Sequence, residues 1–412
     1  MSVVYIRSHS GNCKAEILLP ASKSISNRLM LIKALCKEDF TIENISNSDD
    51  TAILRLCIEN ISKEEVFDVA DAGTAFRFLT ALFAITLGTR ILTGSKQMLK
   101  RPVGDLVKAL KDLGADITYA DKINHPPLII KGRELTKRKS GIRANISSQY
   151  ISALLLIAPR LPQGLELKMS GDVASKPYIT MTLKMMEHFG VYYKWRWKTI
   201  TIEKQLYRPR KFVVESDWSA AAFWYQIVAL SKNAEVELTG LTEDYIQGDK
   251  TIADIFDKLG VKTSFLTNSV LLTKKSIQCV VMTENFFLTP DLFPSVMAAC
   301  IGLNIPFHFT GLQNLIIKES DRVSAMISEL AKFGYYFDYD KDESSLIYDG
   351  NKGKLSDEVV TCNSHDDHRI AMSLAPMSLI HCGIKISNAF CVSKSYPNYF
   401  DDLKKAGFSI DF

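Results

Sequence analysis

One local pattern recurs along this chain at nearly constant spacing, and it limits the possible folds more than any other feature. In its clearest copy, Leu106, Leu110 and Leu113 form an apolar stripe, Gly114 follows, and residues 115–119 are strand-like. The stripe is one face of a helix, and glycine suits the left-handed position at which a helix ends. Further copies end at the glycines Gly190, Gly260, Gly334 and Gly407.

These glycines lie roughly 70 to 76 residues apart, a period that divides the chain into about six α/β units. Residues 50–62 supply a helix for the sixth unit, although no glycine ends it. Helix–glycine–strand segments are common in any α/β protein, but the near-constant spacing favours true repetition. Because 412 residues exceed what one hydrophobic core usually organises, we predict two α/β domains of three units each, with a ligand site between them.

Composition and charge exclude several classes of protein. The net charge of +4 is small for this length, and we identify no surface stretch of alternating aromatic and basic residues, so a nucleic-acid binder is not expected. The N-terminus lacks the pattern of a signal peptide, and no segment approaches the roughly 18 apolar residues of a membrane span. The eight cysteines form no CxxC pair and suit buried thiols in a reducing compartment. We therefore expect a cytoplasmic protein without a membrane segment.

The first segment that could carry chemistry crowds serines, Lys23 and Arg28 at the entrance of an apolar helix expected from Leu29. Free N–H groups at a helix start favour an anion, and the two cations add full charges. The serines could instead only cap the helix. The segment is not a P-loop, because the glycines of that motif are missing.

Four further polar segments of the N-terminal half precede helices, at residues 71–77, 100–102, 147–150 and 175–178. Gly73 would let a ligand approach the backbone closely, and Thr74 can cap the helix or donate a hydrogen bond. Pro102 can begin a helix at its first turn and leave Arg101 just outside it. Helix capping explains the serine-rich segments equally well.

The candidate segments of the C-terminal half carry more charge. Asp291 precedes an apolar helix, and a strand expected at residues 314–317 delivers the acid/base cluster 318–322. A solvated run of charges is the alternative for that cluster. Residues 365–369 contain two histidines and two aspartates, but no fourth ligand group lies nearby, so we expect no metal. Residues 393–397 form the last polar segment.

Taken together, these segments resemble one family, the 5-enolpyruvylshikimate-3-phosphate synthases, or 3-phosphoshikimate 1-carboxyvinyltransferases. The stretches that match, in family order and over nearly the whole chain, are SKSISNR, DAGTAFR, LKRPVGDL, SSQY, SKPY, KESDR, DDHRIAM and SKSYP. The resemblance implies two similar α/β domains, each an inside-out barrel of three βαβαββ units, with the active site in the interdomain cleft. The first domain would comprise residues 1–20 and 217–412, and the second residues 21–216.

The resemblance also implies an activity. Such an enzyme transfers the enolpyruvyl group of phosphoenolpyruvate to the 5-hydroxyl of shikimate 3-phosphate, on the shikimate pathway toward chorismate and aromatic amino acids. Phosphate is released by addition and elimination through a tetrahedral intermediate, without a metal or cofactor. We expect a monomer with these two small-molecule substrates, no nucleic-acid partner, and sensitivity to glyphosate.

Site residues are implied position by position. The catalytic group would contain Lys23, Asp291 and Glu319. Shikimate 3-phosphate would contact Lys23, Ser24, Arg28, Ser147, Ser148, Gln149, Ser175, Tyr178, Asp291, Asn314 and Lys318. Phosphoenolpyruvate would contact Lys23, Gly73, Arg101, Gln149, Arg322, Arg369 and Lys394.

The chemistry requires two proton movements, and the charges suit the substrates. Asp291 is our candidate base for the attacking hydroxyl, whereas Glu319 and Lys23 are both candidates for the proton on carbon. The seven cations in these sets could neutralise two substrates that each carry a phosphate and a carboxylate. Asp71 departs from the family, which usually has asparagine there, so we expect its carboxylate to be turned away or paired, with Arg77 as one candidate partner.

Two alternative functions are considered. The related UDP-N-acetylglucosamine enolpyruvyl transferases share the fold, but they have asparagine after the lysine that corresponds to Lys23, where this chain has Ser24. They also usually have a cysteine in the loop before the position of Arg101, and residues 95–100 of this chain contain none. A non-catalytic phosphometabolite-binding protein would use the basic residues alone. The presence of Asp291 and Glu319 argues against it.

Overall fold

The five glycines that end the predicted repeats all adopt the left-handed conformation. Their φ angles are 108° at Gly114, 78° at Gly190, 87° at Gly260, 100° at Gly334 and 95° at Gly407. The helices that end just before them are α4 (Gly104–Asp112), α6 (Lys176–His188), α8 (Ile252–Lys258), α10 (Arg322–Ala331) and α12 (Tyr399–Lys405). The periodic pattern of helix and glycine is therefore confirmed in this computed structural model, which describes residues 3–243 and 246–412.

Each complete repeat has the order βαβαββ and forms one four-stranded sheet. Its first two strands pair in parallel and the others antiparallel, so that the spatial order is first, second, fourth, third. Within the described residues, five sheets have this topology. The chain divides by its contacts into two units, residues 21–214 and residues 1–20 with 215–412.

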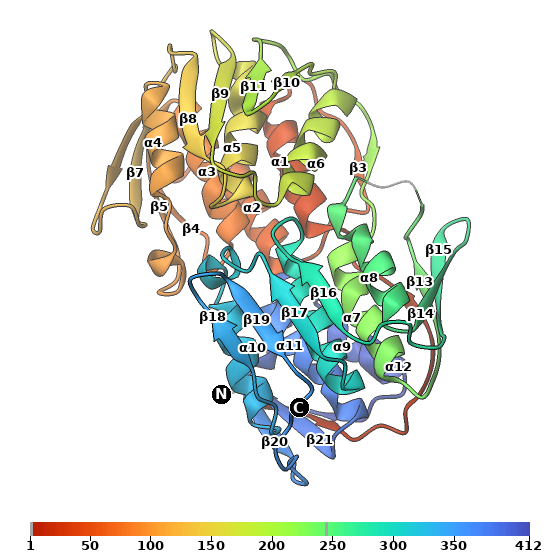
Figure 1. Cartoon of the computed structure of the whole chain (residues 1–412). Coiled ribbons are helices and arrows are strands. Elements are labelled where there is room, and N and C mark those ends of the chain that lie inside the picture. The colour runs from red at the N-terminus through yellow and green to blue at the C-terminus, as the bar shows by residue number, and fades with distance from the viewer. Residues whose placement is uncertain (1–2, 244–245) are drawn as a thin grey trace. The chain divides into compact units, whose positions relative to one another are not determined.

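The unit of residues 21–214 contains two complete repeats and one reduced repeat (Figure 1). The first complete repeat comprises β4 (Val66–Asp68), α3 (Gly73–Ile85), β5 (Gly88–Thr93), α4, β6 (Asp116–Tyr119) and β7 (Leu128–Gly132). The second comprises β8 (Lys139–Arg143), α5 (Ser148–Ile157), β9 (Leu165–Ser170), α6, β10 (Lys194–Arg196) and β11 (Thr199–Ile202). The reduced repeat comprises α1 (Lys23–Leu35), β3 (Ile42–Glu43), α2 (Asp49–Glu59) and β12 (Phe212–Val213).

The reduced repeat departs from the expected three full copies. Its sheet consists of β3 and β12 alone, each two residues long, which pair in parallel. The chain enters and leaves the unit through this repeat, and α2 is followed after a few residues by β4 of the next one. Those few residues do not form the hairpin that completes the other sheets.

The unit of residues 1–20 with 215–412 contains three complete repeats, two of which use a strand from the N-terminal segment. The first comprises β2 (Asn12–Leu18), α7 (Trp218–Leu230), β13 (Asn233–Thr239), α8, β14 (Val261–Phe265) and β15 (Ser269–Lys274). The second comprises β16 (Met282–Asn285), α9 (Phe293–Leu303), β17 (Phe307–Thr310), α10, β18 (Asp338–Asp340) and β19 (Ser345–Tyr348). The third comprises β20 (Val360–Asn363), α11 (His368–Leu374), β21 (Gly383–Ser387), α12, β22 (Ile410–Asp411) and β1 (Val3–Arg7).

The first helix of each repeat lies at the centre of its unit. Helices α1, α3 and α5 contact one another, as do α7, α9 and α11. Every residue of α7 and α11 is buried, and α7 is apolar on nearly all sides, so that it is stable only when covered all round. The sheets therefore lie outside the helices, as expected for an inside-out barrel. No helix in residues 3–243 or 246–412 is both long and apolar enough to cross a membrane.

Two predicted helix starts were wrong. Helix α1 begins at Lys23 rather than near Leu29, so the polar residues lie within its first turns instead of ahead of it. Helix α4 begins at Gly104, and Pro102 lies outside it. The reason is that the Val103 N–H donates to Asn124 O at 2.9 Å, which holds Val103 in a non-helical conformation.

The strand predicted at residues 314–317 was also wrong. Residues Leu315–Ile317 form a 3-10 turn, η5, which follows a hydrogen bond from Leu315 N–H to Leu312 O of 2.9 Å. The run of β-branched residues favoured a strand, but Ile316 is exposed, and a local turn satisfies this short segment.

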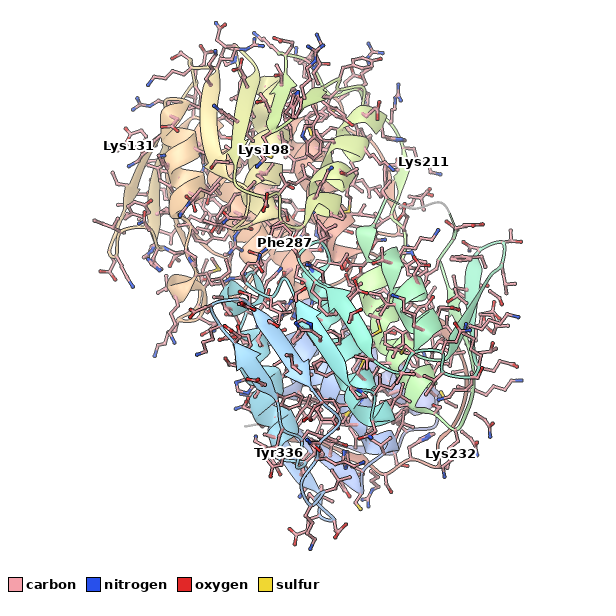
Figure 2. The ribbon with its side chains drawn as sticks, in the orientation of Figure 1. Lys131, Lys198, Lys211, Lys232, Phe287 and Tyr336 are labelled. Atoms are coloured by element: carbon pink, nitrogen blue, oxygen red, sulfur yellow. The ribbon has the colours of Figure 1, made fainter. Side chains whose placement is uncertain are left out.

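A surface stretch of aromatic and basic residues, which sequence analysis overlooked, runs from Tyr192 to Lys198. It forms β10 and the turn to β11, and Figure 2 labels Lys198 on this sheet. Trp197 at the turn is 99% exposed and has a φ of 54°. A non-glycine residue in this conformation costs about 1–2 kcal/mol, and asparagine tolerates it better than tryptophan.

We therefore expect Trp197→Asn to raise the free energy of unfolding by about 0.5–1 kcal/mol. Thermal melting would measure the change. Tyr192→Asn is the control, because Tyr192 is also exposed but is not left-handed, and it should bring no gain. A lower melting temperature for Trp197→Asn would contradict the argument from strain.

Candidate active site

The predicted site residues lie mainly at the N-terminal ends of helices, in one cluster per unit. The α1–α6 cluster contains Lys23, Ser24, Arg28, Gly73, Arg101, Ser147, Ser148, Gln149, Ser175 and Tyr178. The α9–α11 cluster contains Asp291, Asn314, Lys318, Glu319, Arg322, Arg369 and Lys394. Backbone N–H groups and the helix dipole at these ends favour anions.

Arg28 is the central cation of the α1–α6 cluster and is only 2% exposed. Its guanidinium donates to Thr182 Oγ1 at 2.7 Å and to Ser152 Oγ at 3.2 Å, and also to the carbonyl oxygens of Ser24 and Tyr178. Within the described residues no carboxylate pairs with it. Burial lowers the pKa of Arg28 to about 10, so the group is still charged at neutral pH. The Arg28 guanidinium therefore lies beside the first two turns of α5 and α6, near the helix ends that favour anions, and a bound anion would offset its charge.

Arg90 in the same unit is also buried but differs in its surroundings. Its guanidinium donates to the carbonyl oxygens of Ile61, Thr86 and Leu87 at 2.8–3.0 Å. Thr86 follows the last residue of α3, where free carbonyl groups favour a cation. Arg90 is therefore a structural arginine, whereas the surroundings of Arg28 suit a ligand.

Gly73, at the first position of α3, faces two guanidinium groups. A Cβ atom placed there would clash with Nη1 of both Arg101 and Arg77. Arg77 Nη1 donates to Gln149 Oε1 at 3.1 Å, and Gln149 Nε2 donates to Thr74 Oγ1 at 3.1 Å. These bonds fix the Gln149 amide at the start of α5. Arg101 itself ends the 3-10 turn η1 (Met98–Lys100).

Lys23 forms an ion pair with Asp50 of α2, with Nζ 3.1 Å from Oδ2, and both side chains are largely buried. The Ser147 hydroxyl accepts from Gln149 N–H at 3.3 Å and so caps α5, as the capping alternative predicted. Ser175 precedes α6 with a φ of 51°. The Asp71 carboxylate accepts a hydrogen bond from the Ser95 hydroxyl, a partner that the sequence did not indicate.

In the α9–α11 cluster three carboxylates surround the guanidinium of Arg322, which is 1% exposed. Its Nε lies 2.7 Å from Asp367 Oδ2, its Nη1 lies 2.7 Å from Asp291 Oδ1, and its Nη2 lies 2.8 Å from Glu319 Oε2. Arg369 Nη2 lies 2.9 Å from Asp291 Oδ2. The predicted acid/base cluster is therefore a buried network rather than a solvated run of charges.

The charges of this network set the protonation of its members. Burial raises the pKa of Asp291, but Arg369, Lys318 and Arg322 outweigh it, so that this pKa lies well below its ordinary value. Burial lowers the pKa of Lys318 despite the nearby carboxylate of Asp291. Asp291 is accordingly ionised at neutral pH and is a weak base while its three cations face it.

Asn314 and Lys394 complete the α9–α11 cluster. Asn314, just before η5, is 5% exposed, and within the described residues its Nδ2 has no hydrogen-bond partner. A buried donor without a partner suits a polar ligand atom. Lys394 ends the 3-10 turn η7 (Ala389–Lys394), and its Nζ donates to Asp366 O at 2.8 Å. Asp291 lies in the 3-10 turn η4 (Pro290–Leu292) that leads into α9.

Asp50, Arg77 and Asp367 contact the predicted site residues but were not among them, although Arg77 was considered as a partner of Asp71. Asp367 and Arg77 lie inside the matched stretches DDHRIAM and DAGTAFR, so their positions gave a signal that could have placed them in the site. Asp50 lies outside those stretches, and only the packing of α2 against α1 brings it to Lys23.

Two of the four histidine and aspartate residues in segment 365–369 are used in other contacts. His365 Nε2 lies 2.8 Å from Glu329 Oε1, and Asp367 binds Arg322. Among the residues that the structure describes, no three His, Cys, Asp or Glu side chains are grouped to hold a metal ion.

Comparisons with known proteins agree over the whole length of the chain. The family model of EPSP synthase (3-phosphoshikimate 1-carboxyvinyltransferase) matches residues 8–403. A 3-phosphoshikimate 1-carboxyvinyltransferase from Bacteroides fragilis is 45% identical over 411 residues, which are 98% of each chain. One from Vibrio campbellii is 32% identical, covering 95% of this chain and 96% of its own. The solved structure of an EPSP synthase from Acinetobacter baumannii has a TM-score of 0.77 at 19% identity and covers 100% of both chains.

Proposed function

The chain belongs to the EPSP synthase family, and from this premise we propose that it transfers the enolpyruvyl group of phosphoenolpyruvate to the 5-hydroxyl of shikimate 3-phosphate. The strongest structural support for the proposal is the environment of Arg28. This buried cation lies near the N-terminal ends of helices and has no carboxylate partner in the described residues. Such an environment suits an anionic group of a substrate. The matched family model supports this activity over transfer to UDP-N-acetylglucosamine.

We propose that the two clusters serve one pair of substrates. In the α1–α6 cluster Lys23, Arg28, Arg77 and Arg101 outnumber the carboxylates of Asp50 and Asp71. In the α9–α11 cluster the four cations Lys318, Arg322, Arg369 and Lys394 exceed the three carboxylates of Asp291, Glu319 and Asp367 by only one, and the carboxylates pair with the first three cations. The first cluster therefore attracts anions more strongly, and shikimate 3-phosphate would contact the residues that the resemblance implies there. Phosphoenolpyruvate would contact cations of both clusters.

The ion pairs of the α9–α11 cluster suggest how Asp291 would act. When anionic groups of the substrates form ion pairs with Arg322, Arg369 and Lys318, the pKa of Asp291 should rise, because these cations hold this pKa low in the free enzyme. Asp291 would then accept the proton of the 5-hydroxyl while the hydroxyl oxygen bonds to carbon 2 of phosphoenolpyruvate. The methylene carbon gains a proton, and the tetrahedral adduct later loses phosphate and a methyl proton. Glu319 and Lys23 both remain candidates for the proton on carbon.

The test is an assay of phosphate release. The proposal expects release only when shikimate 3-phosphate and phosphoenolpyruvate are both present, with enolpyruvyl shikimate 3-phosphate as the second product. Binding of both compounds without release would favour a non-catalytic binding protein. Release with UDP-N-acetylglucosamine instead would favour the related transferase.

Gly73→Ala should weaken the use of phosphoenolpyruvate. The added methyl group would push the guanidinium groups of Arg101 and Arg77 aside, and overpacking of this kind costs about 1–3 kcal/mol. We expect the KM for phosphoenolpyruvate to rise roughly 5- to 150-fold and inhibition by glyphosate, which lies in the phosphoenolpyruvate site, to weaken. Steady-state kinetics with and without glyphosate would measure both.

Gly141→Ala is the matched control, because a Cβ atom there meets only Lys168 O at an ordinary 3.8 Å. It should leave both values unchanged. If Gly73→Ala left the KM for phosphoenolpyruvate and the inhibition by glyphosate unaltered, Gly73 would not be part of the phosphoenolpyruvate site.

We further propose that the units of residues 1–20 with 215–412 and of residues 21–214 are the two domains of the enzyme. The enzyme would act as a monomer in the cytoplasm. Size-exclusion chromatography with light scattering would test the monomer, whose expected mass is 46.2 kDa.

A further inference from the structure

The segment from Asn363 to Arg369 contains two successive non-glycine residues in the left-handed conformation. His365 has a φ of 53° and Asp366 a φ of 55°. Residues other than glycine avoid this region, and two in succession persist only where their surroundings enforce them. We call residues 363–367 the strained turn.

The strained turn determines where three proposed phosphoenolpyruvate contacts lie. Asp367, its last residue, caps α11 by accepting from Arg369 N–H at 2.9 Å, and it also holds the guanidinium of Arg322. The carbonyl oxygen of Asp366 accepts from Lys394 Nζ at 2.8 Å. A change in the conformation of this turn would displace Arg322, Arg369 and Lys394 together.

Glu329 of α10 bonds the strained turn at two points. Its Oε2 accepts from Asn363 N–H at 2.9 Å, and its Oε1 lies 2.8 Å from His365 Nε2. Glu329 is 2% exposed, and its Oε2 also accepts from Lys332 Nζ of the same helix. Burial raises the pKa of Glu329, but His365, Lys332 and the Asn363 N–H outweigh it and lower this pKa to about 2. Glu329 is therefore a fixed anion at neutral pH.

Glu329 is also on the same helix as Arg322. Helix α10 begins at Arg322, and Glu329 lies about two turns further along it. One rigid helix thus holds both the central guanidinium of the α9–α11 cluster and the anchor of the turn that supplies its partner Asp367.

We propose that Glu329 is a positioning residue for phosphoenolpyruvate, which keeps the strained turn in the conformation that aligns Arg322, Arg369 and Lys394. Glu329 belongs to none of the predicted binding sets, and it acts through Asn363 and His365 rather than by touching a substrate. The inference rests on the proposed function, because it assigns the aligned cations to phosphoenolpyruvate.

The test compares Glu329→Gln with Lys332→Gln in the full-length protein. Glutamine has one acceptor oxygen, so it cannot accept from both Asn363 N–H and His365 Nε2–H, and it removes the negative charge that strengthens both bonds. Lys332→Gln removes the bond from Lys332 to Glu329 and leaves both bonds to the turn. For Glu329→Gln we expect the KM for phosphoenolpyruvate to rise about 10- to 100-fold, since small misplacements in a site have effects of this size. The KM for shikimate 3-phosphate should change far less. Lys332→Gln should leave both KM values unchanged.

Amide hydrogen exchange of residues 363–369 supplies a readout that does not depend on turnover. Glu329→Gln should speed exchange there without a general loss of protection, and Lys332→Gln should not. Unchanged exchange in Glu329→Gln, or equal rises of both KM values together with general destabilisation, would overturn the inference. If the unaltered protein released no phosphate, the proposed function would fail, and the exchange data would still decide whether Glu329 enforces the turn.

Discussion

Replacing Asp291 by asparagine should lower kcat by about 100- to 10,000-fold, the range that general acid–base groups contribute. Asparagine keeps the shape of the side chain and cannot accept the proton of the attacking hydroxyl. The substitution also removes one negative charge from beside Arg322, Arg369 and Lys318. The KM for phosphoenolpyruvate should therefore stay the same or fall. A loss in kcat without a rise in KM distinguishes a group that acts in the transition state from one that only binds.

Asp338→Asn is the control, since Asp338 is an exposed carboxylate on β18 of the same unit. It should leave kcat unchanged. Single-turnover measurements of phosphate release, with both substrates saturating, would give the rate of the chemical steps directly. A kcat for Asp291→Asn within about threefold of the unaltered enzyme would mean that another group accepts the hydroxyl proton.

Features of short range in the sequence were predictable. Each repeat helix and its glycine follow from a pattern of about ten residues, and the left-handed conformation of Gly114 and its four counterparts follows from the need to end a helix. The polar segments likewise lie at helix starts, because N–H groups there need partners. A few residues decide such features, and those residues are adjacent in the chain.

Features that depend on distant segments were not predictable. Strand β1 completes a sheet whose other strands come from residues 360–411, and β2 completes one whose other strands come from residues 233–274. No local signal in the sequence assigns either strand to its sheet. The strained turn is bonded by Glu329, which lies more than 30 residues earlier. The start of α4 depends in the same way on the bond between Val103 and Asn124. Pairings of this kind appear only when the chain folds.

Arg28→Met should separate binding from stability. We expect the affinity for shikimate 3-phosphate to fall by at least about 30-fold, because truncating one partner of a buried charge pair costs about 2–5 kcal/mol. The melting temperature without substrate should not fall and should rise if the buried charge is costly, since methionine removes an unpaired cation from beside helix N-termini. The hydroxyl groups that Arg28 contacts remain satisfied, because Thr182 and Ser152 lie 2.8 Å apart and Thr182 donates to Tyr178 O at 2.9 Å.

Arg90→Met is the matched control and should behave in the opposite way. It leaves the carbonyl oxygens of Ile61, Thr86 and Leu87 without their donor, so the melting temperature should fall while the affinity for shikimate 3-phosphate is unchanged. Calorimetric titration would give the affinity of each variant for shikimate 3-phosphate, and thermal melting would give the melting temperature of each. If Arg28→Met bound shikimate 3-phosphate as tightly as the unaltered protein, or if it melted like Arg90→Met, then Arg28 would be a structural arginine, and the α1–α6 cluster would lose its central ligand-binding charge.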